Sequence, residues 1–209
     1  MEKVYYWRVD EVSDLNPESP WPGRTWNFTT ADFLIVDDFE DYNDYPPDEI
    51  YNTWLDGYLD PLNGATVGYL IPNWAAGEHF VETRIVHGGE QAMPLFYANT
   101  GTATYSEGER TFAVAQDWTE AGVDTLVLYF HGAPENTGQL HVKINGHKVP
   151  YDGDADDIRQ RRWARWSIAI GSLPVNAQSV TKLGIGIDGA NATGTLYFDN
   201  IRLYRPPRP

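Results

Sequence analysis

Cysteine is absent from this chain, and positive charge is scarce. The lack of cysteine in 209 residues excludes both a disulfide framework and a metal site built from thiolates. Fifteen Lys and Arg residues stand against thirty Asp and Glu residues, and the net charge of -15 argues against nucleic acid and anionic membrane surfaces as partners. No apolar run approaches the roughly 18 residues that a membrane-spanning helix needs. We therefore expect a protein that binds neither nucleic acid nor a membrane.

The sequence motifs of common enzyme classes are also missing. There is no Gly-x-Ser-x-Gly elbow, no Walker loop and no dinucleotide-binding fingerprint, and the five histidines lack the spacing of zinc ligands. Paired carboxylates for glycoside hydrolysis remain possible, but thirty acids allow so many pairs that none stands out. The sequence therefore favours a non-catalytic protein.

Alternation of apolar and polar residues is the main structural signal that the chain does contain. In Thr125–His131 and Gln139–Ile144, apolar residues recur at every second position, which is typical of strands with one buried face. The dipeptide Asn145-Gly146 that follows is a strong hairpin signal. Residues Phe80–Val86 also predict a short strand. Because helical periodicity is weak throughout, the chain is predicted to be all-β, as a sandwich or barrel.

The last predicted strand, Gly194–Tyr204, contains a break in its alternation. Two polar residues fall together at Asp199 and shift the pattern by one position, which predicts a β-bulge. The bulge would turn the Asp199 carboxylate toward the rim of the core, where a bare charge is costly and a hard divalent cation would stabilise it. Residues Phe33–Glu40 form another apolar strand that ends in acids. If the two strands pair, Asp38 or Glu40 could meet Asp199 at one site.

Aromatic residues are abundant, with eight Trp and thirteen Tyr. An exposed indole or phenol ring can cover the flat C–H face of a sugar, while neighbouring polar side chains bond its hydroxyl groups. An acidic chain of this kind suits a neutral or basic glycan better than a polyanionic one. Trp118 and Trp166 lie at strand entries and are expected to be structural. The candidates for sugar contact are Trp54, Tyr58, Trp74, Tyr97, Tyr129, His131 and Trp163.

The two ends of the chain differ in composition from the middle. Tyr5–Val9 and Trp26–Thr30 resemble the last two strands of a fibronectin type III-like domain. The chain begins abruptly in a strand, so we expect its start to lie inside a longer exported protein. The expected organisation is a partial fibronectin-like strand pair in residues 1–31, a main domain in residues 32–204, and the start of a Pro-rich linker in residues 205–209.

Five short motifs follow one another along the main domain. They are Val36-Asp-Asp-Phe-Glu40, His87-Gly-Gly-Glu-Gln-Ala-Met93, Asp117-Trp118, Trp166 before two isoleucines, and Tyr197-Phe-Asp-Asn-Ile-Arg-Leu203. In order and spacing, these motifs resemble those of the β-jelly-roll carbohydrate-binding modules of large secreted bacterial proteins of planctomycete type.

This resemblance implies a β-sandwich of jelly-roll type with two antiparallel sheets and one structural calcium. In such modules the calcium lies between the first strand, a Gly-containing turn and the last strand. Carried over to this sequence, Glu40 and Asp199 supply carboxylates, and Asp38 and the turn near Glu90 are further contributors. The resemblance supplies no residue-by-residue match for the sugar site.

The function that the resemblance implies is non-catalytic binding of a polysaccharide or oligosaccharide. Such a module holds a larger secreted protein on its glycan, so we expect a secreted monomer that is covalently linked to neighbouring domains. One alternative is a structural or adhesive spacer that uses calcium for stability alone. Another is a jelly-roll polysaccharide lyase or glycoside hydrolase, for which Tyr129, His131 and Arg165 are the set to test.

Overall fold

The computed structural model describes residues 2–206 and divides the chain into two compact units. The first unit is Met1–Leu34 and the second is Ile35–Pro209. Residues 207–209, which belong to the predicted linker, lie outside the described part of the chain. No helix within residues 2–206 is long and apolar enough to cross a membrane.

The first unit is a two-stranded antiparallel ribbon. Strand β1 (Val4–Trp7) pairs with strand β2 (Trp26–Thr29). Aromatic rings stack across the ribbon in two rungs, with centroids 5.3 Å apart for Tyr5–Phe28 and 6.2 Å apart for Trp7–Trp26. The rungs lie on one face because their residues are two positions apart on each strand. The fibronectin-like character of this segment stays a prediction.

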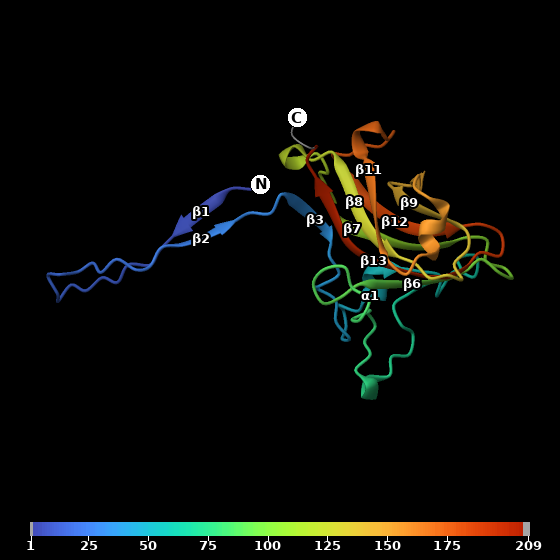
Figure 1. Cartoon of the computed structure of the whole chain (residues 1–209), viewed down its shortest axis with the longest axis horizontal. Coiled ribbons are helices and arrows are strands. Elements are labelled where there is room, and N and C mark those ends of the chain that lie inside the picture. Colours follow the sequence, from blue (N-terminus) through green and yellow to red (C-terminus); the bar gives the residue numbers. More distant parts are fainter. Residues whose placement is uncertain (1, 207–209) are drawn as a thin grey trace. The chain divides into compact units, whose positions relative to one another are not determined.

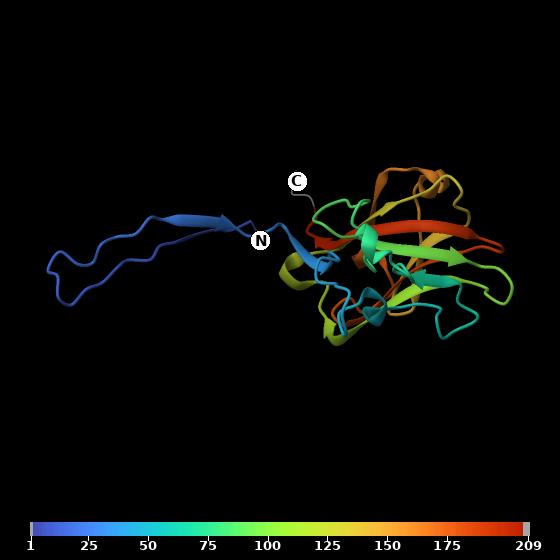
Figure 2. The same cartoon turned by 90° about the horizontal axis from the view of Figure 1, so that it is seen from below.

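The second unit is a sandwich of two antiparallel sheets, as predicted. One sheet has the strand order β10-β9-β12-β7-β4, and the other has the order β11-β8-β13-β6-β5 with β3 also paired to β13. Figures 1 and 2 show these strands from two directions. The strands are β3 (Phe33–Asp37), β4 (Trp54–Leu55), β5 (Ala65–Val67), β6 (Met93–Ala98), β7 (Ser106–Gln116), β8 (Thr125–His131), β9 (Gln139–Ile144), β10 (His147–Pro150), β11 (Trp163–Ala169), β12 (Val180–Asp188) and β13 (Thr193–Tyr204).

Helices are short and lie in the connections between strands. One α-helical turn, α1 (Ile50–Thr53), precedes β4, and Glu49 before it makes no side-chain cap. The remaining helical segments are single 3₁₀ turns. These are η1 (Trp74–Ala76), η2 (Glu120–Gly122), η3 (Ala155–Arg159) and η4 (Ile170–Ser172).

The core lies between the two sheets and follows the predicted alternation. In β9, Leu140, Val142 and Ile144 are fully buried, so this face of the five-stranded sheet packs inward. Trp118 and Trp166 are also buried, as expected of structural side chains. The hydrophobic effect of this burial supplies the main driving force for folding.

Two local predictions about the strands are confirmed. Asn145 and Gly146 both have positive φ, 49° and 81°, and they join β9 to β10 in the tight turn that this dipeptide favours. The register of β13 with β8 shifts between Asp199 and Arg202, where Asn200 has a φ of 53°. This bulge interrupts the strand at the position where the sequence alternation breaks.

Candidate functional site

The seven side chains predicted to contact sugar separate into three groups in the structure. Tyr58 and Trp74 are exposed near one pocket. Tyr129, His131 and Trp163 lie on the outer side of the six-stranded sheet, and the remaining two side chains lie inside the protein. The predicted set therefore does not form one binding surface.

The prediction that Trp54 and Tyr97 contact sugar is wrong because both rings are buried. Trp54 is 0% exposed, and its indole Nε1 donates a hydrogen bond to Asp37 Oδ2 at 2.8 Å. Asp37 also accepts from the Tyr42 hydroxyl at 2.7 Å and forms an ion pair with Arg110. Tyr97 is 3% exposed, and its hydroxyl donates to a main-chain carbonyl. Both rings help to satisfy buried polar groups and are unavailable to a ligand.

The pocket beside Tyr58 has a volume of about 680 Å³ and is formed by four segments of the second unit. These are α1 with the end of β4, the turn after β4, strand β5 and the loop of residues 68–80. Its walls are aromatic and aliphatic, with acidic and amide groups among them. The lining residues are Tyr51, Asn52, Leu55, Asp56, Tyr58, Leu59, Asp60, Val67, Leu70 and Phe80.

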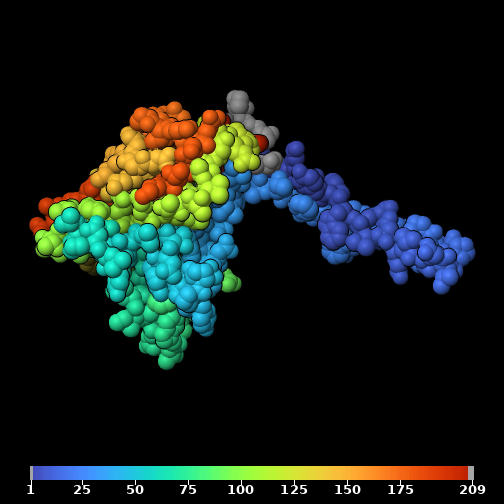
Figure 3. Space-filling model, turned by 180° about the vertical axis from the view of Figure 1, so that it is seen from behind, coloured from blue at the N-terminus to red at the C-terminus, as the bar shows by residue number. Residues whose placement is uncertain are grey.

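The loop of residues 68–80 projects from the sandwich and forms one wall of the pocket (Figures 1 and 3). Asp44 fixes the end of this loop, because its carboxylate accepts from the Phe80 main-chain N–H at 3.0 Å and contacts His79 Nδ1 at 2.6 Å. The Phe80 ring then meets Tyr51 edge-to-face at 5.1 Å and Trp74 at 5.4 Å between centroids. The three rings form one aromatic cluster, of which Tyr51 and Phe80 line the pocket.

Two carboxylates hold the turn that carries Tyr58. Asp56 accepts from the main-chain N–H groups of Val67, at 2.7 Å, and of Tyr58, at 2.9 Å. Asp60 accepts from the Leu62 main-chain N–H at 2.9 Å and from the Tyr105 hydroxyl at 3.0 Å. These bonds position both acids at the pocket while Tyr58 stays 83% exposed. The pocket thus combines an exposed ring with fixed hydrogen-bond acceptors.

The second group forms a row on the outer side of the six-stranded sheet. Trp163 lies opposite His131, and His131 lies opposite Tyr197 on the next strand. The turn at His87 covers part of this row, because the His87 ring stacks on Tyr129 with centroids 3.7 Å apart. Burial lowers the pKa of both His87 and His131, which favours their neutral forms.

The set proposed for a lyase lies in the same region. The register places Arg165 directly opposite Tyr129, two positions from His131 along β8. The His87 ring packs over the phenol of Tyr129, so this tyrosine is engaged within the protein. The arrangement gives no specific support for acid–base chemistry.

The acids predicted to bind calcium gather at the turn of residues 87–91. Asp199 is 0% exposed, and its Oδ2 accepts from the main-chain N–H groups of His87, at 2.7 Å, and Gly88, at 3.0 Å. Its Oδ1 is buried and has no hydrogen-bond partner among residues 2–206. The pKa of Asp199 is raised to about 6, chiefly by burial, and the negative charge of Glu40 acts in the same direction.

Glu40 holds the other side of the same turn. Its carboxylate accepts from the main-chain N–H groups of Glu90, at 3.0 Å, and Gln91, at 3.0 Å. Gly89 has a φ of +78°, and a Cβ built there would lie 2.2 Å from Glu40 Oε1, so the turn requires glycine. Asp38 accepts weakly from the Glu40 N–H at 3.5 Å. Glu90 therefore takes part through its main chain.

Carboxylates alone do not complete a metal site at this turn. Within the described part of the chain, no group of three or more His, Asp or Glu side chains could hold a metal ion. Two carboxylates of like charge and one unsatisfied oxygen nevertheless suit a hard cation that also takes carbonyl or water oxygens. The donor set fits calcium if main-chain oxygens or waters supply the remaining ligands.

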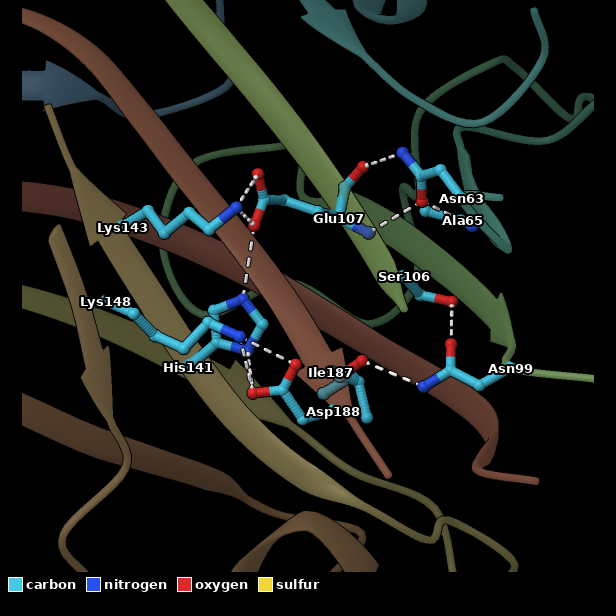
Figure 4. Close-up of polar contacts among 10 residues, drawn as sticks. All are labelled: Asn63, Ala65, Asn99, Ser106, Glu107, His141, Lys143, Lys148, Ile187 and Asp188. Carbon is cyan, nitrogen blue, oxygen red and sulfur yellow. Dashed lines mark hydrogen bonds and ion pairs between the residues drawn. The ribbon is translucent and has the colours of Figure 1, made fainter. Parts of the chain in front are cut away.

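Sequence reasoning missed a network of charged side chains on the outer face of the five-stranded sheet (Figure 4). Lys143 Nζ lies 2.7 Å from Glu107 Oε2, and His141 lies between Glu107, at 3.2 Å, and Asp188, at 3.3 Å. Lys148 pairs with Asp188 at 2.7 Å. Burial acts to raise the pKa of Glu107, but the hydrogen bonds of His141 and Lys143 outweigh it and lower that pKa.

Two glycines on β12 make room for this network. A Cβ at Gly186 would lie 2.8 Å from His141 Nε2, and one at Gly184 would lie 3.2 Å from the Glu107 carboxyl carbon. His141 and Glu107 are consequently buried although they stand on the outer face of a sheet. Alternate glycines in a strand are the sequence signal for such close packing. Because its charges are paired with one another, this network stabilises the sheet.

Comparison with known proteins relates the chain to others through its fold. No family of known sequences matches it, and no curated protein does. The solution structure of CtCBM11 shares the fold with a TM-score of 0.50 at 14% identity, covering 84% of this chain and 96% of that one. An exo-beta-agarase matches with a TM-score of 0.50 at 15% identity, covering 86% of this chain and 25% of the agarase.

A further solved structure is the family 11 carbohydrate-binding module of the cellulosomal cellulase Lic26A-Cel5E of Clostridium thermocellum. Its TM-score is 0.47 at 15% identity, with 83% of this chain and 95% of that chain covered. The structural neighbours of this chain thus include carbohydrate-binding modules. At these identities the likeness concerns the fold.

Proposed function

We propose that this chain is a non-catalytic glycan-binding module, on the premise that its sandwich fold is shared with solved carbohydrate-binding modules. The observation that carries the proposal is the pocket beside Tyr58. An exposed phenol ring, aromatic rings from the neighbouring cluster and fixed hydrogen-bond acceptors line this pocket, whose volume is about 680 Å³. That volume is typical of small-molecule sites.

The chemistry of the pocket suits a sugar ring. The phenol of Tyr58 is 83% exposed, and together with the rings of Tyr51 and Phe80 in the lining it presents flat apolar faces against which the C–H face of a pyranose can stack. Asn52 and the carboxylates of Asp56 and Asp60 lie beside these rings and can accept from sugar hydroxyls. The remaining lining residues are the aliphatic side chains of Leu55, Leu59, Val67 and Leu70, which add apolar surface for contact with a sugar ring.

The proposal includes a structural calcium at the turn of residues 87–91. The unpartnered Oδ1 of Asp199 and its neighbour Glu40 support it, with Asp38 and the Glu90 main chain beside them. A cation there would neutralise two like charges and tie β3, the turn and β13 together. Calcium supplies stability in this proposal, and sugar contact remains with the pocket. The protein would be secreted as part of a longer chain.

The experiment that tests the proposal is isothermal titration calorimetry against a panel of soluble glycans, with calcium present. Tyr58→Ala should weaken binding about three- to tenfold, because an aromatic contact contributes about 0.5–1.5 kcal/mol. Tyr45→Ala is the matched control, since Tyr45 is 75% exposed in the same acidic segment and does not line the pocket. Binding that is equal in the two variants would remove the pocket from the proposal. A folded protein that binds no glycan would favour the spacer alternative.

A further inference from the structure

We infer that the pocket selects glycans with free, protonated amino groups, such as a chain of β-linked glucosamine, over neutral and acidic glycans. The inference rests on the proposed glycan-binding function and names the substrate class of the same pocket. It depends on the net negative charge of the segments that form the pocket and on the free acceptor capacity of its two carboxylates. It depends also on the aromatic lining and on the pairing of acids with lysines on the five-stranded sheet.

The segments that form the pocket contain acids without basic residues. Between Arg24 and Arg84 the chain has no Lys or Arg, and it carries twelve Asp and Glu residues in that stretch. Every residue that lines the pocket falls within this stretch. The one imidazole there, His79, already contacts Asp44 at 2.6 Å. An anionic sugar would find no cation among the lining residues, and a cationic sugar would be attracted.

The two carboxylates at the pocket keep acceptor capacity for a ligand. Each oxygen of Asp56 and of Asp60 accepts one hydrogen bond from within the protein. An ionised carboxylate offers about four lone-pair sites, so each acid retains about two. Both side chains are half-buried, which reduces the screening of their charge by water. An ammonium group, with three donors and no acceptor, matches such a pair better than a hydroxyl does.

The aromatic lining favours the same ligand. The rings of Tyr51, Tyr58 and Phe80 border the pocket, and the face of an aromatic ring attracts an ammonium ion. A neutral sugar gains the stacking contact but lacks this electrostatic contribution. The combination of rings and carboxylates therefore distinguishes an amino sugar from its hydroxyl analogue.

Acidity at the pocket does not simply reflect the net charge of the chain. On the outer face of the five-stranded sheet, the acids Glu107, Glu109 and Asp188 are each paired with a lysine at 2.5–2.7 Å. The lysines of the second unit thus neutralise one face, while the acids at the pocket have none nearby in sequence. Attraction of a cationic ligand should for that reason concentrate at the pocket.

Three β-1,4-linked hexasaccharides that differ at one position of each ring test the inference: glucosamine, N-acetylglucosamine and glucose. In calorimetry at low salt, we expect the glucosamine hexamer to bind about three- to tenfold more tightly than the other two, as one or two partly exposed ion pairs would give. This advantage should shrink when salt is raised to about 0.5 M, because screening weakens the attraction. Equal affinity for all three, or tighter binding of glucose, would overturn the inference and leave the proposed function intact. Failure of all three, together with the wider panel, would overturn both.

Variants separate pocket recognition from general attraction of a cation to an acidic protein. Asp60→Asn keeps an acceptor for the Leu62 N–H and a donor for the Tyr105 hydroxyl, so it removes charge with little change of structure. It should reduce the preference for glucosamine about two- to fivefold. Asp156→Asn removes the same charge from an exposed acid in η3 that does not line the pocket, and it should leave the preference unchanged. Equal effects of the two variants, or glucosamine binding that survives Tyr58→Ala in full, would contradict recognition by the pocket.

Discussion

Two buried carboxylates, Asp37 in β3 and Asp199 in β13, lie in neighbouring strands of one sheet but have different surroundings. Asp37 accepts from a main-chain N–H, the Tyr42 hydroxyl and the Trp54 indole, and it pairs with Arg110. Asp199 accepts two main-chain N–H groups on one oxygen, and its other oxygen has no partner within residues 2–206.

The fold supplies Asp37 with hydrogen-bond donors and a counter-ion, whereas it leaves one oxygen of Asp199 without a partner within residues 2–206. Burial raises the pKa of Asp37 as well, but its counter-ion Arg110 and the donors on both of its oxygens act against that shift inside the protein. Asp199 faces Glu40, a like charge, without a basic partner among residues 2–206, and its pKa is raised to about 6. Such a group requires either a proton or an external cation. The three predictions below test this contrast.

The largest effect is expected from Asp37→Asn. This change leaves Arg110 without its counter-ion, and the new side-chain amide cannot accept on both sides from the groups that donate to Asp37. It should therefore reduce the free energy of unfolding by about 3–5 kcal/mol. Urea denaturation followed by tryptophan fluorescence measures it. Asp38→Asn is the control, because the Asp38 side chain makes only one long hydrogen bond within the described part of the chain, and it should change stability by less than about 0.5 kcal/mol. Similar losses in the two variants would refute the special role of Asp37.

A smaller effect is expected from calcium. If calcium binds at Asp199 and Glu40, a hundredfold excess over Kd should stabilise the fold by about 2.7 kcal/mol, and EDTA should reverse the gain. Asp199→Asn should abolish the response, since it removes the unpartnered oxygen's charge but keeps an acceptor for the turn. Asp156→Asn, at an exposed acid, should retain it. Thermal melts with and without calcium decide the point, and identical melts of the wild-type protein would exclude the cation.

The smallest effect concerns pH in calcium-free buffer. The pKa of Asp199 in the folded protein, about 6, lies above its ordinary value of 3.8, so between these values the folded state binds more protons than the unfolded state. Stability should then fall as pH rises from about 4 to about 7, by about 1–2 kcal/mol after allowance for solvent screening. The Asp199→Asn variant should lose this part of the slope. If the free energy of unfolding depends on pH equally in the variant and the wild-type protein, groups other than Asp199 cause that dependence.

The features that the sequence predicted well depend on local pattern. The bulge at Asp199 is visible as a break in a period of two, and the turn at Asn145-Gly146 is visible as a dipeptide that tolerates positive φ. The pairing of β3 with β13, which the sequence raised only as a condition for bringing their acids together, is present in the structure. In each case the physical cause lies within a few neighbouring residues.

The features that the sequence did not predict depend on contacts between distant residues. Trp54 stands among acidic and polar residues that indicate a loop, yet its indole reaches Asp37, seventeen positions away, inside the core. Phe80 was predicted to begin a strand, but it ends a loop that Asp44 holds, thirty-six positions away. No local periodicity encodes such contacts, so the sequence pointed to the pocket only through one isolated aromatic candidate, Tyr58.

The loop of residues 68–80 has a consequence for how such a protein can change over evolutionary time. Its side chains at Leu70, Ile71 and Trp74 are 67%, 91% and 55% exposed, so substitutions there remove little buried surface. The same loop contributes one wall of the pocket. Mutations can therefore accumulate and be selected for a new ligand with little risk to folding. The sandwich can thus be inherited unchanged while the loop of residues 68–80 acquires a different ligand specificity.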